Sequence, residues 1–155
     1  MDKFTIVIPV YNEAKNLRIL IPKIYQELKN IKFELIIVDD NSNDGTSRVL
    51  KKFNNKNLNY IIRKSERDLS KSCILGFKKA RYKNIIVMDG DLQHKPSDIK
   101  KFLRIFHKNN PDIIVGTRDL FKNKKHNLNI FRLFASRVLI LSVNLLLGNK
   151  TSDPM

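Results

Sequence analysis

The sequence predicts one α/β domain, built on a mostly parallel central sheet flanked by helices. Short apolar runs alternate with amphipathic stretches along the chain, 42% of the 155 residues are hydrophobic, and no internal repeat or low-complexity tract interrupts the alternation. Strand–helix alternation of this kind is typical of parallel sheets with right-handed connections. A chain of this length and apolar content can bury one core. We therefore expect a single domain over residues 1–155.

The expected strands are five short apolar runs. Residues 4–10 are rich in β-branched side chains, which favour strands. The run at 35–38 is apolar throughout, as strands are in parallel sheets that are covered on both faces. The remaining strands are expected at residues 58–62, 85–88 and 113–115.

The expected helices connect these strands. Residues 16–29 place apolar side chains at helical spacing, and the polar loop 39–46 offers several N-caps for a second helix. A third helix is expected at 70–80, and a fourth begins near Pro96, because proline is tolerated in a first turn. The side chains expected to face inward are Val49, Leu50 and Phe53 of the second helix, Cys73, Ile74 and Phe77 of the third, and Ile99, Phe102, Leu103 and Phe106 of the fourth.

The composition limits the compartment and the partners. A single cysteine, Cys73, excludes an intramolecular disulfide, and no His/Cys cluster indicates a zinc site. The opening residues lead directly into an expected strand, and no run of 18 apolar residues is present, so we expect a cytosolic domain without a signal peptide or a membrane span. The 30 Lys and Arg against 15 Asp and Glu give a net charge of +15. This excess favours an anionic partner: nucleic acid, an anionic membrane surface or a small phosphorylated substrate.

The second part of the chain is poor in acids. Residues 95–137 hold 11 basic and three acidic side chains, against 18 and 11 in residues 1–94. The apolar stretch 130–147, which carries two arginines, predicts either a core-packing helix or a helix that lies on a membrane surface. Residues 151–155 contain neither a helix cap nor a polar tail, so we expect the natural protein to continue beyond them.

Polar side chains follow three of the expected strands. Because ligands bind beyond the carboxyl ends of strands in open parallel sheets, we expect these side chains to converge. Asp89 and Asp91 have the spacing that lets two carboxylates reach one ion, Gly90 permits close backbone approach, and Gln93 adds an oxygen. Oxygen ligands suit Mg²⁺ or Mn²⁺, although a solvated turn is the alternative for this short motif. The strand-end residues are Tyr11, Asn12 and Glu13, then Asp39 and Asp40, then Asp89 and Asp91.

Two well-known phosphate-binding motifs are absent from the sequence. It contains neither GxxxxGK[S/T] nor GxGxxG. Walker-type and dinucleotide-type phosphate binding are therefore disfavoured. A ligand that carries phosphate would instead be held by a metal ion and by basic side chains.

Three segments in collinear order resemble the family 2 glycosyltransferases of the GT-A fold: residues 6–13 (IVIPVYNE), 38–46 (VDDNSNDGT) and 88–94 (MDGDLQH). The resemblance covers essentially the whole chain, and it implies a GT-A (Rossmann-like) domain. Within that family, the dolichol/polyprenyl-phosphate mannose synthases are the most similar subgroup. The segments similar to that subgroup are 67–70, 89–94, 116–118, Arg132 with 136–137, and 152–155.

The resemblance implies roles for individual residues. Asp89, Asp91 and Gln93 would bind the divalent ion that bridges the donor diphosphate. Asp91 and Arg118 are the residues that we expect to carry catalysis. The residues expected to line the nucleotide-sugar pocket are Pro9, Tyr11, Glu13, Val38 and Asp40, supported by Asp39, with Met88 and Gly90 contributing backbone. The arginines expected to meet phosphate groups of donor or acceptor are Arg118, Arg132 and Arg137.

The function implied by the resemblance is that of an inverting, metal-dependent transferase. It would move mannose from GDP-mannose to dolichyl or polyprenyl phosphate at the cytoplasmic face of a membrane. The sequence leaves a UDP-sugar donor, such as UDP-glucose, open. A nucleic-acid-binding or non-catalytic membrane-binding module is disfavoured, because Asp89 and Asp91 are intact and the aromatic residues after residue 94 have the helical spacing of a core.

Overall fold

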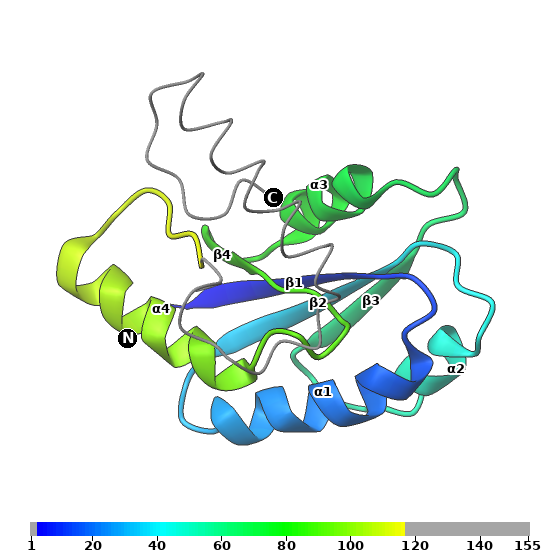
Figure 1. Cartoon of the computed structure of the whole chain (residues 1–155), viewed down its shortest axis with the longest axis horizontal. Helices are drawn as coiled ribbons and strands as arrows, with labels where there is room; N and C mark the ends of the chain where they lie inside the picture. Colours follow the sequence, from blue (N-terminus) through cyan, green and yellow to red (C-terminus); the bar gives the residue numbers. More distant parts are fainter. Residues whose placement is uncertain (1–2, 117–155) are drawn as a thin grey trace, which may run out of the picture. The chain divides into compact units, whose positions relative to one another are not determined.

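The computed structural model describes residues 3–116, which form a parallel four-stranded sheet with helices on both faces (Figure 1). The strands are β1 (Phe4–Val10), β2 (Phe33–Asp39), β3 (Leu58–Ile62) and β4 (Asn84–Val87), in the sheet order β3-β2-β1-β4. The helices are α1 (Ala14–Glu27), α2 (Thr46–Leu50), α3 (Leu69–Lys79) and α4 (Pro96–Asn109). The predicted α/β fold class is confirmed, and these elements lie within one unit, Met1–Asn110.

The two central strands form the buried middle of the sheet. Every residue of β1 and β2 is buried, and the strands pair in parallel from Phe4 opposite Phe33 to Val10 opposite Asp39. The strands β3 and β4 pair with β2 and β1, also in parallel. The carboxyl ends of all four strands therefore share one edge of the sheet, where the polar strand-end residues were expected.

Helices cover the two faces of this sheet separately. In Figure 1, α1 and α4 lie on one face and α3 lies on the other. Alternate side chains of a strand point to opposite faces, so each face has its own apolar cluster. Val7, Ile36 and Val38 form the smaller cluster, with Leu75 of α3 packed against it. The main core combines Phe4, Ile6, Ile8 and Val10 of β1 with Leu17, Leu20, Ile21 and Ile24 of α1 and Ile99 of α4.

The inward face of α3 differs from the prediction. The sequence predicts that Ile74 and Phe77 face the core, but they are 47% and 40% exposed, and Cys73 is only partly buried. The buried residues of α3 are Ser72 and Gly76. This helix lies so close to the sheet that a Cβ atom on Gly76 would come within 2.3 Å of Val7 Cγ1. At this contact only small residues fit between the helix and the sheet, and the hydropathy of the sequence does not reveal how closely the two approach.

The substitution Gly76→Ala is expected to lower the free energy of unfolding by about 1–3 kcal/mol, because the added methyl group overpacks the contact with Val7. In the double variant Val7→Ala/Gly76→Ala the clashing Cγ atoms are gone. We expect Gly76→Ala to cost much less in that background than in the wild type. Urea unfolding of the four proteins measures this coupling, and strictly additive effects would contradict the close approach of α3.

The fifth predicted strand does not form. Helix α4 ends at Asn109, its C-cap Asn110 has a left-handed backbone (φ 42°), and residues 111–116 contain no helix or strand. Ile113 and Val115 are 80% and 76% exposed. An apolar run forms a strand only where a neighbouring strand satisfies its backbone groups, and the run itself does not reveal whether one is available. Within residues 3–116, no helix has the length and apolarity needed to cross a bilayer.

Candidate nucleotide-sugar site

The loops that follow the four strands meet at the carboxyl edge of the sheet. The loop after β4 lies close to the end of β1 and to the loop that follows it: a Cβ atom on Gly90 would lie 2.9 Å from Val10 Cγ1 and 3.6 Å from Glu13 Cγ. Glycine is needed here because any side chain would push these two loops apart. The end of β1 and the loop after β4 therefore converge, as predicted for the strand-end residues.

Asp40, at the end of β2, forms a buried ion pair with Arg63. The Asp40 Oδ1 atom accepts a hydrogen bond from Arg63 Nη1, and both side chains are 6% exposed. The second oxygen, Oδ2, accepts from the backbone N–H of Asp68 at 2.7 Å. A buried ion pair is tolerated only where further hydrogen bonds satisfy its remaining atoms. Both carboxylate oxygens of Asp40 are thus occupied.

Arg63 also holds the loop that leads into α3. Its Nη1 donates to Asp68 O and to Ser72 Oγ, each at 3.0 Å, and its Nη2 donates to Ser65 Oγ at 2.9 Å and to Glu66 O at 3.2 Å. One side chain therefore connects the ends of β2 and β3 with the first turn of α3. Arg63 is not among the site residues predicted from the sequence. The sequence does show that Arg63 directly follows the predicted strand 58–62. In the structure this strand pairs with β2, and its last residue, Ile62, lies opposite Asp39.

A cavity of about 360 Å³ opens beside this ion pair. The guanidinium of Arg67 lies over the ring of Tyr11, 4.5 Å from the ring centroid, which is a cation–π contact. Of the residues predicted for the nucleotide pocket, Pro9, Tyr11 and Asp40 line this cavity. The complete lining is Pro9, Val10, Tyr11, Asp40, Arg67, Asp68, Leu69 and Ser72.

The other predicted pocket residues do not line this cavity. Val38 is fully buried in the cluster beneath α3. Glu13 lines a neighbouring cavity of about 320 Å³ and accepts a hydrogen bond from Asn16 Nδ2 at 2.5 Å. Asp39 is fully buried; its Oδ1 accepts from Ser42 N at 3.0 Å, and its Oδ2 has no hydrogen-bond partner in the described part of the chain. Asp39 thus holds the loop after β2 through Ser42.

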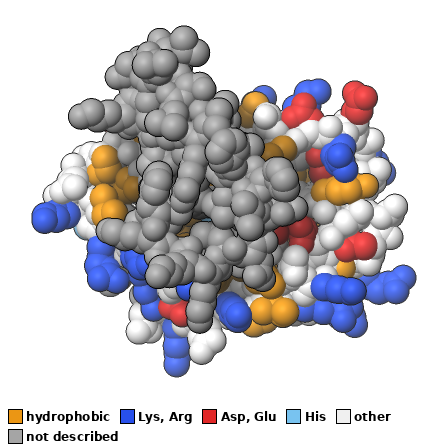
Figure 2. Space-filling view, viewed as in Figure 1, with side chains coloured by type: hydrophobic (Ala, Val, Ile, Leu, Met, Phe, Trp, Pro, Cys, Tyr) orange, Lys and Arg blue, Asp and Glu red, His pale blue; other side chains and the backbone are white. Residues whose placement is uncertain are grey.

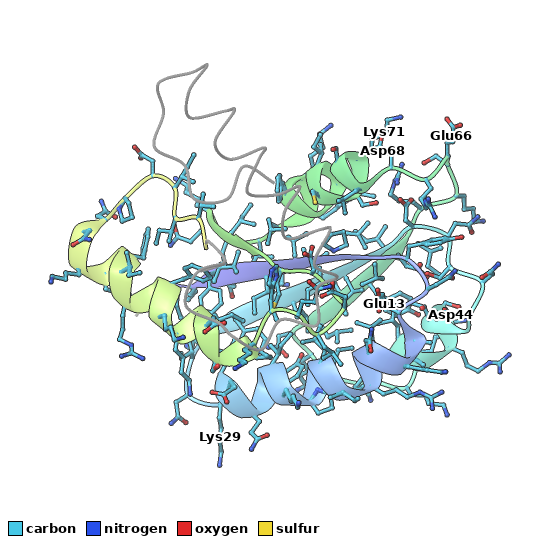
Figure 3. The ribbon with its side chains drawn as sticks, in the orientation of Figure 1. Glu13, Lys29, Asp44, Glu66, Asp68 and Lys71 are labelled. Atoms are coloured by element: carbon cyan, nitrogen blue, oxygen red, sulfur yellow. The ribbon has the colours of Figure 1, made fainter. Side chains whose placement is uncertain are left out.

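Asp44 joins the loops after β1 and β2, and Figure 3 shows it beside Glu13 at the starts of α1 and α2. Its Oδ2 accepts from the backbone N–H of Ala14 at 2.9 Å, and its Oδ1 accepts from Thr46 N at 3.0 Å and from Thr46 Oγ1 at 2.6 Å. Ala14 and Thr46 are the first residues of the two helices, so one carboxylate caps both. Burial raises the pKa of Asp44, but the hydrogen bonds from Thr46 and Ala14 outweigh it and lower that pKa below its ordinary value.

The substitution Asp44→Ala is expected to lower the free energy of unfolding by about 1–2 kcal/mol near neutral pH, since it removes a helix cap. Because the pKa is lower in the folded state, this contribution is present above the unfolded-state pKa and is lost as the pH falls through the folded-state pKa. The stability difference between wild type and Asp44→Ala should therefore shrink below about pH 4. Urea unfolding across pH 3–7 tests this, and a difference that stays constant into acid would contradict it.

The Asp89-Gly90-Asp91 loop presents its carboxylates at the same edge. It begins at the buried Met88, whose N–H donates to Val7 O at 3.1 Å. The Asp89 side chain is 51% exposed, with its Oδ2 3.8 Å from His94 Nδ1, and Asp91 Oδ1 accepts from the backbone N–H of Gln93 at 2.9 Å. Burial first, and then the negative charge of Asp89, raise the pKa of the Cys73 thiol, so this loop also lies near α3.

The donor set of this loop fits a divalent cation by its chemistry. Two carboxylates, completed by water and phosphate oxygens, are the usual environment of Mg²⁺ in proteins. Within residues 3–116, no group of three or more His, Cys, Asp or Glu side chains is placed to hold a metal ion. Any ion at Asp89 and Asp91 therefore needs further oxygens, such as those of a bound diphosphate.

Several predicted features lie outside the described residues. They are Arg118, Arg132, Arg137 and the helix expected at 130–147. On the face of the molecule in Figure 2, Lys and Arg side chains lie at several separate places, with Asp and Glu side chains among them. The view therefore shows no single basic patch on the described surface of this face.

Comparison with known proteins connects this arrangement to a family. The model of the family "Glycosyl transferase family 2" matches residues 5–151. The chain is 36% identical over 140 residues to the dolichol-phosphate mannosyltransferase of Pyrococcus furiosus, an alignment that covers 90% of this chain and 40% of that protein. The chain spans between 40% and 61% of the length of the curated relatives that it matches.

Two solved structures share the fold. The structure of S. aureus TarS 1-349 in complex with UDP-GlcNAc matches with a TM-score of 0.59 at 20% identity, over 78% of this chain and 38% of that one. The mannosyltransferase PcManGT from Pyrobaculum calidifontis, in complex with GDP-Man and Mn²⁺, matches with a TM-score of 0.50 at 24% identity, over 57% of this chain and 27% of that one. The parallel sheet and its flanking helices thus form a fold similar to that of GT-A glycosyltransferases. The chain belongs to glycosyltransferase family 2.

Proposed function

We propose that this chain belongs to an inverting, metal-dependent transferase that moves mannose from GDP-mannose to dolichyl or polyprenyl phosphate. The observation that carries the proposal is that the cavity and the acidic loop adjoin. Val10 lines the cavity, and it also contacts the acidic loop. Its Cγ1 atom would lie 2.9 Å from a Cβ atom on Gly90, the residue that separates Asp89 from Asp91 in the sequence. A nucleoside in the cavity thus has its diphosphate on the side of the two carboxylates. The name of the Pyrococcus relative supports the sugar and the acceptor.

The described residues supply the nucleotide side of the site. Pro9 and Tyr11 give the cavity apolar and aromatic walls for the base and the ribose. Asp40 gives it a fixed carboxylate, since Arg63 and the N–H of Asp68 hold both of its oxygens in place. Each of these groups is positioned before the donor binds, and preorganisation of this kind lowers the cost of binding.

The metal proposed at Asp89, Asp91 and Gln93, Mg²⁺ or Mn²⁺, would offset the negative charge that develops on the departing nucleoside diphosphate. An acceptor phosphate is already ionised near neutral pH, so it needs orientation and partial charge neutralisation and no general base. We assign that task to Arg118, together with Arg132 and Arg137. Attack from the face of the sugar opposite the nucleotide inverts the anomeric centre.

A lipid acceptor places the proposed reaction at a membrane, and we propose its cytoplasmic face. The net charge of +15 would attract the chain to anionic lipids. The stretch 130–147 would then lie at the interface, with its apolar side toward the lipid. Surface attraction of this kind is screened by salt, so binding to anionic vesicles that does not weaken as salt is raised would contradict this part of the proposal.

A transfer assay on the full chain tests the proposed function. GDP-mannose, UDP-glucose and UDP-GlcNAc are each supplied with a short polyprenyl phosphate, with and without Mn²⁺. We expect GDP-mannose to give the mannosylated polyprenyl phosphate, and only when the divalent ion is present. A product from a UDP-sugar alone would favour the second candidate, a UDP-sugar transferase, which the UDP-GlcNAc complex of TarS motivates. If no donor is turned over and none binds, the transferase proposal is wrong.

A further inference from the structure

The cavity beside Tyr11 is lined by one arginine, Arg67, whose N–H groups are available to a ligand. The Arg67 guanidinium rests on the Tyr11 ring, 4.5 Å from its centroid. Stacking uses the face of a guanidinium and leaves its in-plane N–H groups available. None of the residues from 3 to 116 accepts a hydrogen bond from Arg67 or pairs with it in a salt bridge. Arg67 therefore offers an oriented fork of donors to whatever enters the cavity.

Asp68 contributes the opposite hydrogen-bonding pattern to the same cavity. Figure 3 shows it at the start of α3, where its Oδ1 accepts from the backbone N–H of Lys71 at 2.9 Å. The side chain is 34% exposed, and its Oδ2 is 3.5 Å from Lys71 Nζ. The N–H of Lys71, above all, lowers the pKa of Asp68, so the carboxylate is ionised and acts only as an acceptor near neutral pH.

The remaining polar side chains of the cavity are already engaged. Both oxygens of Asp40 accept hydrogen bonds, from Arg63 and from the N–H of Asp68. The hydroxyl of Ser72 accepts from Arg63 and donates to Asp68 O at 3.1 Å. Asp40 is also buried, at 6% exposed, whereas the Asp68 side chain is 34% exposed and each of its oxygens can accept a further hydrogen bond besides its contact with Lys71. The polar groups that a ligand can reach are therefore the donor fork of Arg67 and the carboxylate of Asp68.

We propose that Arg67 and Asp68 select a guanine base, an inference that rests on the proposed function and assigns its choice of nucleotide to two residues. Guanine presents two adjacent acceptors, O6 and N7, which arginine contacts with two hydrogen bonds. On the neighbouring edge it presents two adjacent donors, N1–H and N2–H₂, which suit the two oxygens of a carboxylate. Guanine thus offers two acceptors to the Arg67 guanidinium and two donors to the Asp68 carboxylate.

Other bases leave part of this set unpaired. Adenine carries an amino donor where guanine has O6, which opposes the donors of Arg67. Uracil has a single N–H donor, so it satisfies the Asp68 carboxylate incompletely. A polar site rejects a ligand that leaves its hydrogen-bonding groups unpaired far more strongly than an apolar site rejects a misfit. Arg67 and Asp68 are therefore specificity-determining residues.

Nucleotide binding to the full chain tests the inference without a transfer assay. GDP, IDP, ADP and UDP are titrated calorimetrically in the presence of Mn²⁺; IDP differs from GDP only in lacking the N2 amino group. We expect the wild type to bind GDP roughly 10- to 100-fold more tightly than ADP. Arg67→Lys keeps the charge but loses the fork, so the GDP/ADP ratio should fall at least about threefold, toward the GDP/IDP ratio. The GDP/IDP ratio itself should be retained, because Asp68 still recognises the N2 amino group that IDP and ADP both lack.

Asp68→Asn provides the complementary measurement, because asparagine also caps helices well. It should abolish the preference for GDP over IDP and leave the GDP/ADP ratio above about tenfold, since Arg67 still reads O6 and N7. Lys64→Ala, which removes a neighbouring exposed cation, is the matched control and should change neither ratio. Ratios within one variant compare nucleotides on the same folded fraction, so partial unfolding does not affect them.

The outcomes separate this inference from the proposed function. If the wild type prefers GDP but Arg67→Lys and Asp68→Asn leave both ratios unchanged, the base is selected elsewhere and the inference is wrong, while the transferase proposal stands. A wild type that prefers UDP overturns the inference and favours the UDP-sugar donor. If none of the four nucleotides binds, both proposals fail.

Discussion

Replacing Arg63 with methionine is expected to lower the free energy of unfolding by about 3–5 kcal/mol, because the substitution leaves a buried carboxylate without its counter-ion. The side chains of Arg63 and Asp40 are both 6% exposed, so water cannot replace the lost partner. The hydrogen bonds to Ser65, Asp68 and Ser72 are lost at the same time. The loop between β3 and α3 should lose its order together with the stability.

Two further variants show whether the effect comes from the buried charge. In Arg63→Met/Asp40→Asn the unpaired charge is gone, so we expect part of the stability to return. Arg48→Met removes an exposed arginine of α2 and should change the free energy of unfolding by less than about 0.5 kcal/mol. Urea unfolding monitored by circular dichroism measures all of these. If Arg63→Met costs no more than Arg48→Met, the buried ion pair does not hold this wall of the cavity.

Asp91→Asn is expected to lower the rate of sugar transfer at least about 100-fold. Losses of this size are typical when one group that stabilises the charge of a transition state is removed. The prediction rests on the proposed metal site, in which Asp91 contributes a charged oxygen. Stability should change little, because asparagine keeps the oxygen that accepts from Gln93 N. A titration of activity with Mn²⁺ should show that the variant needs a higher concentration of the ion.

Asp98→Asn is the matched control for Asp91→Asn. It removes the same charge from α4, where Asp98 pairs with Lys101 at 2.6 Å, and it should leave both the rate and the Mn²⁺ requirement unchanged. Transfer rates for the two variants are measured at several Mn²⁺ concentrations. Equal activity of Asp91→Asn and Asp98→Asn at every concentration would show that Asp91 is not a metal ligand.

The sheet could be predicted from the sequence because its strands are short, apolar and interrupted by strong turn residues. The first and third strands match their predicted bounds, and the second and fourth differ by at most two residues at either end. The face of α3 could not be predicted, since the close approach of Gly76 to Val7 depends on packing rather than hydropathy. The run at 113–115 has the composition of a strand, but composition does not supply a hydrogen-bonding neighbour.

The site could be predicted in part. Tyr11, Asp39 and Asp89 stand directly after apolar runs, with Asp40 next to Asp39, and the rule for parallel sheets places such residues at one edge. The pairing of Asp40 with Arg63 was not predictable in this way, because the two residues are 23 positions apart and meet only through the parallel pairing of β2 with β3. The roles of Arg67 and Asp68 depend on how the loop held by Arg63 turns toward Tyr11.

The double cap formed by Asp44 has a consequence for motion. Because this carboxylate binds the N–H groups of Ala14 and Thr46 together, the first turns of α1 and α2 cannot fray independently. Their amide hydrogens should exchange with solvent through a shared opening event, as expected of one cooperative unit. We therefore expect the loops after β1 and β2 to open together at the carboxyl edge of the sheet. A nucleotide that binds one of these loops should also slow hydrogen exchange in the other.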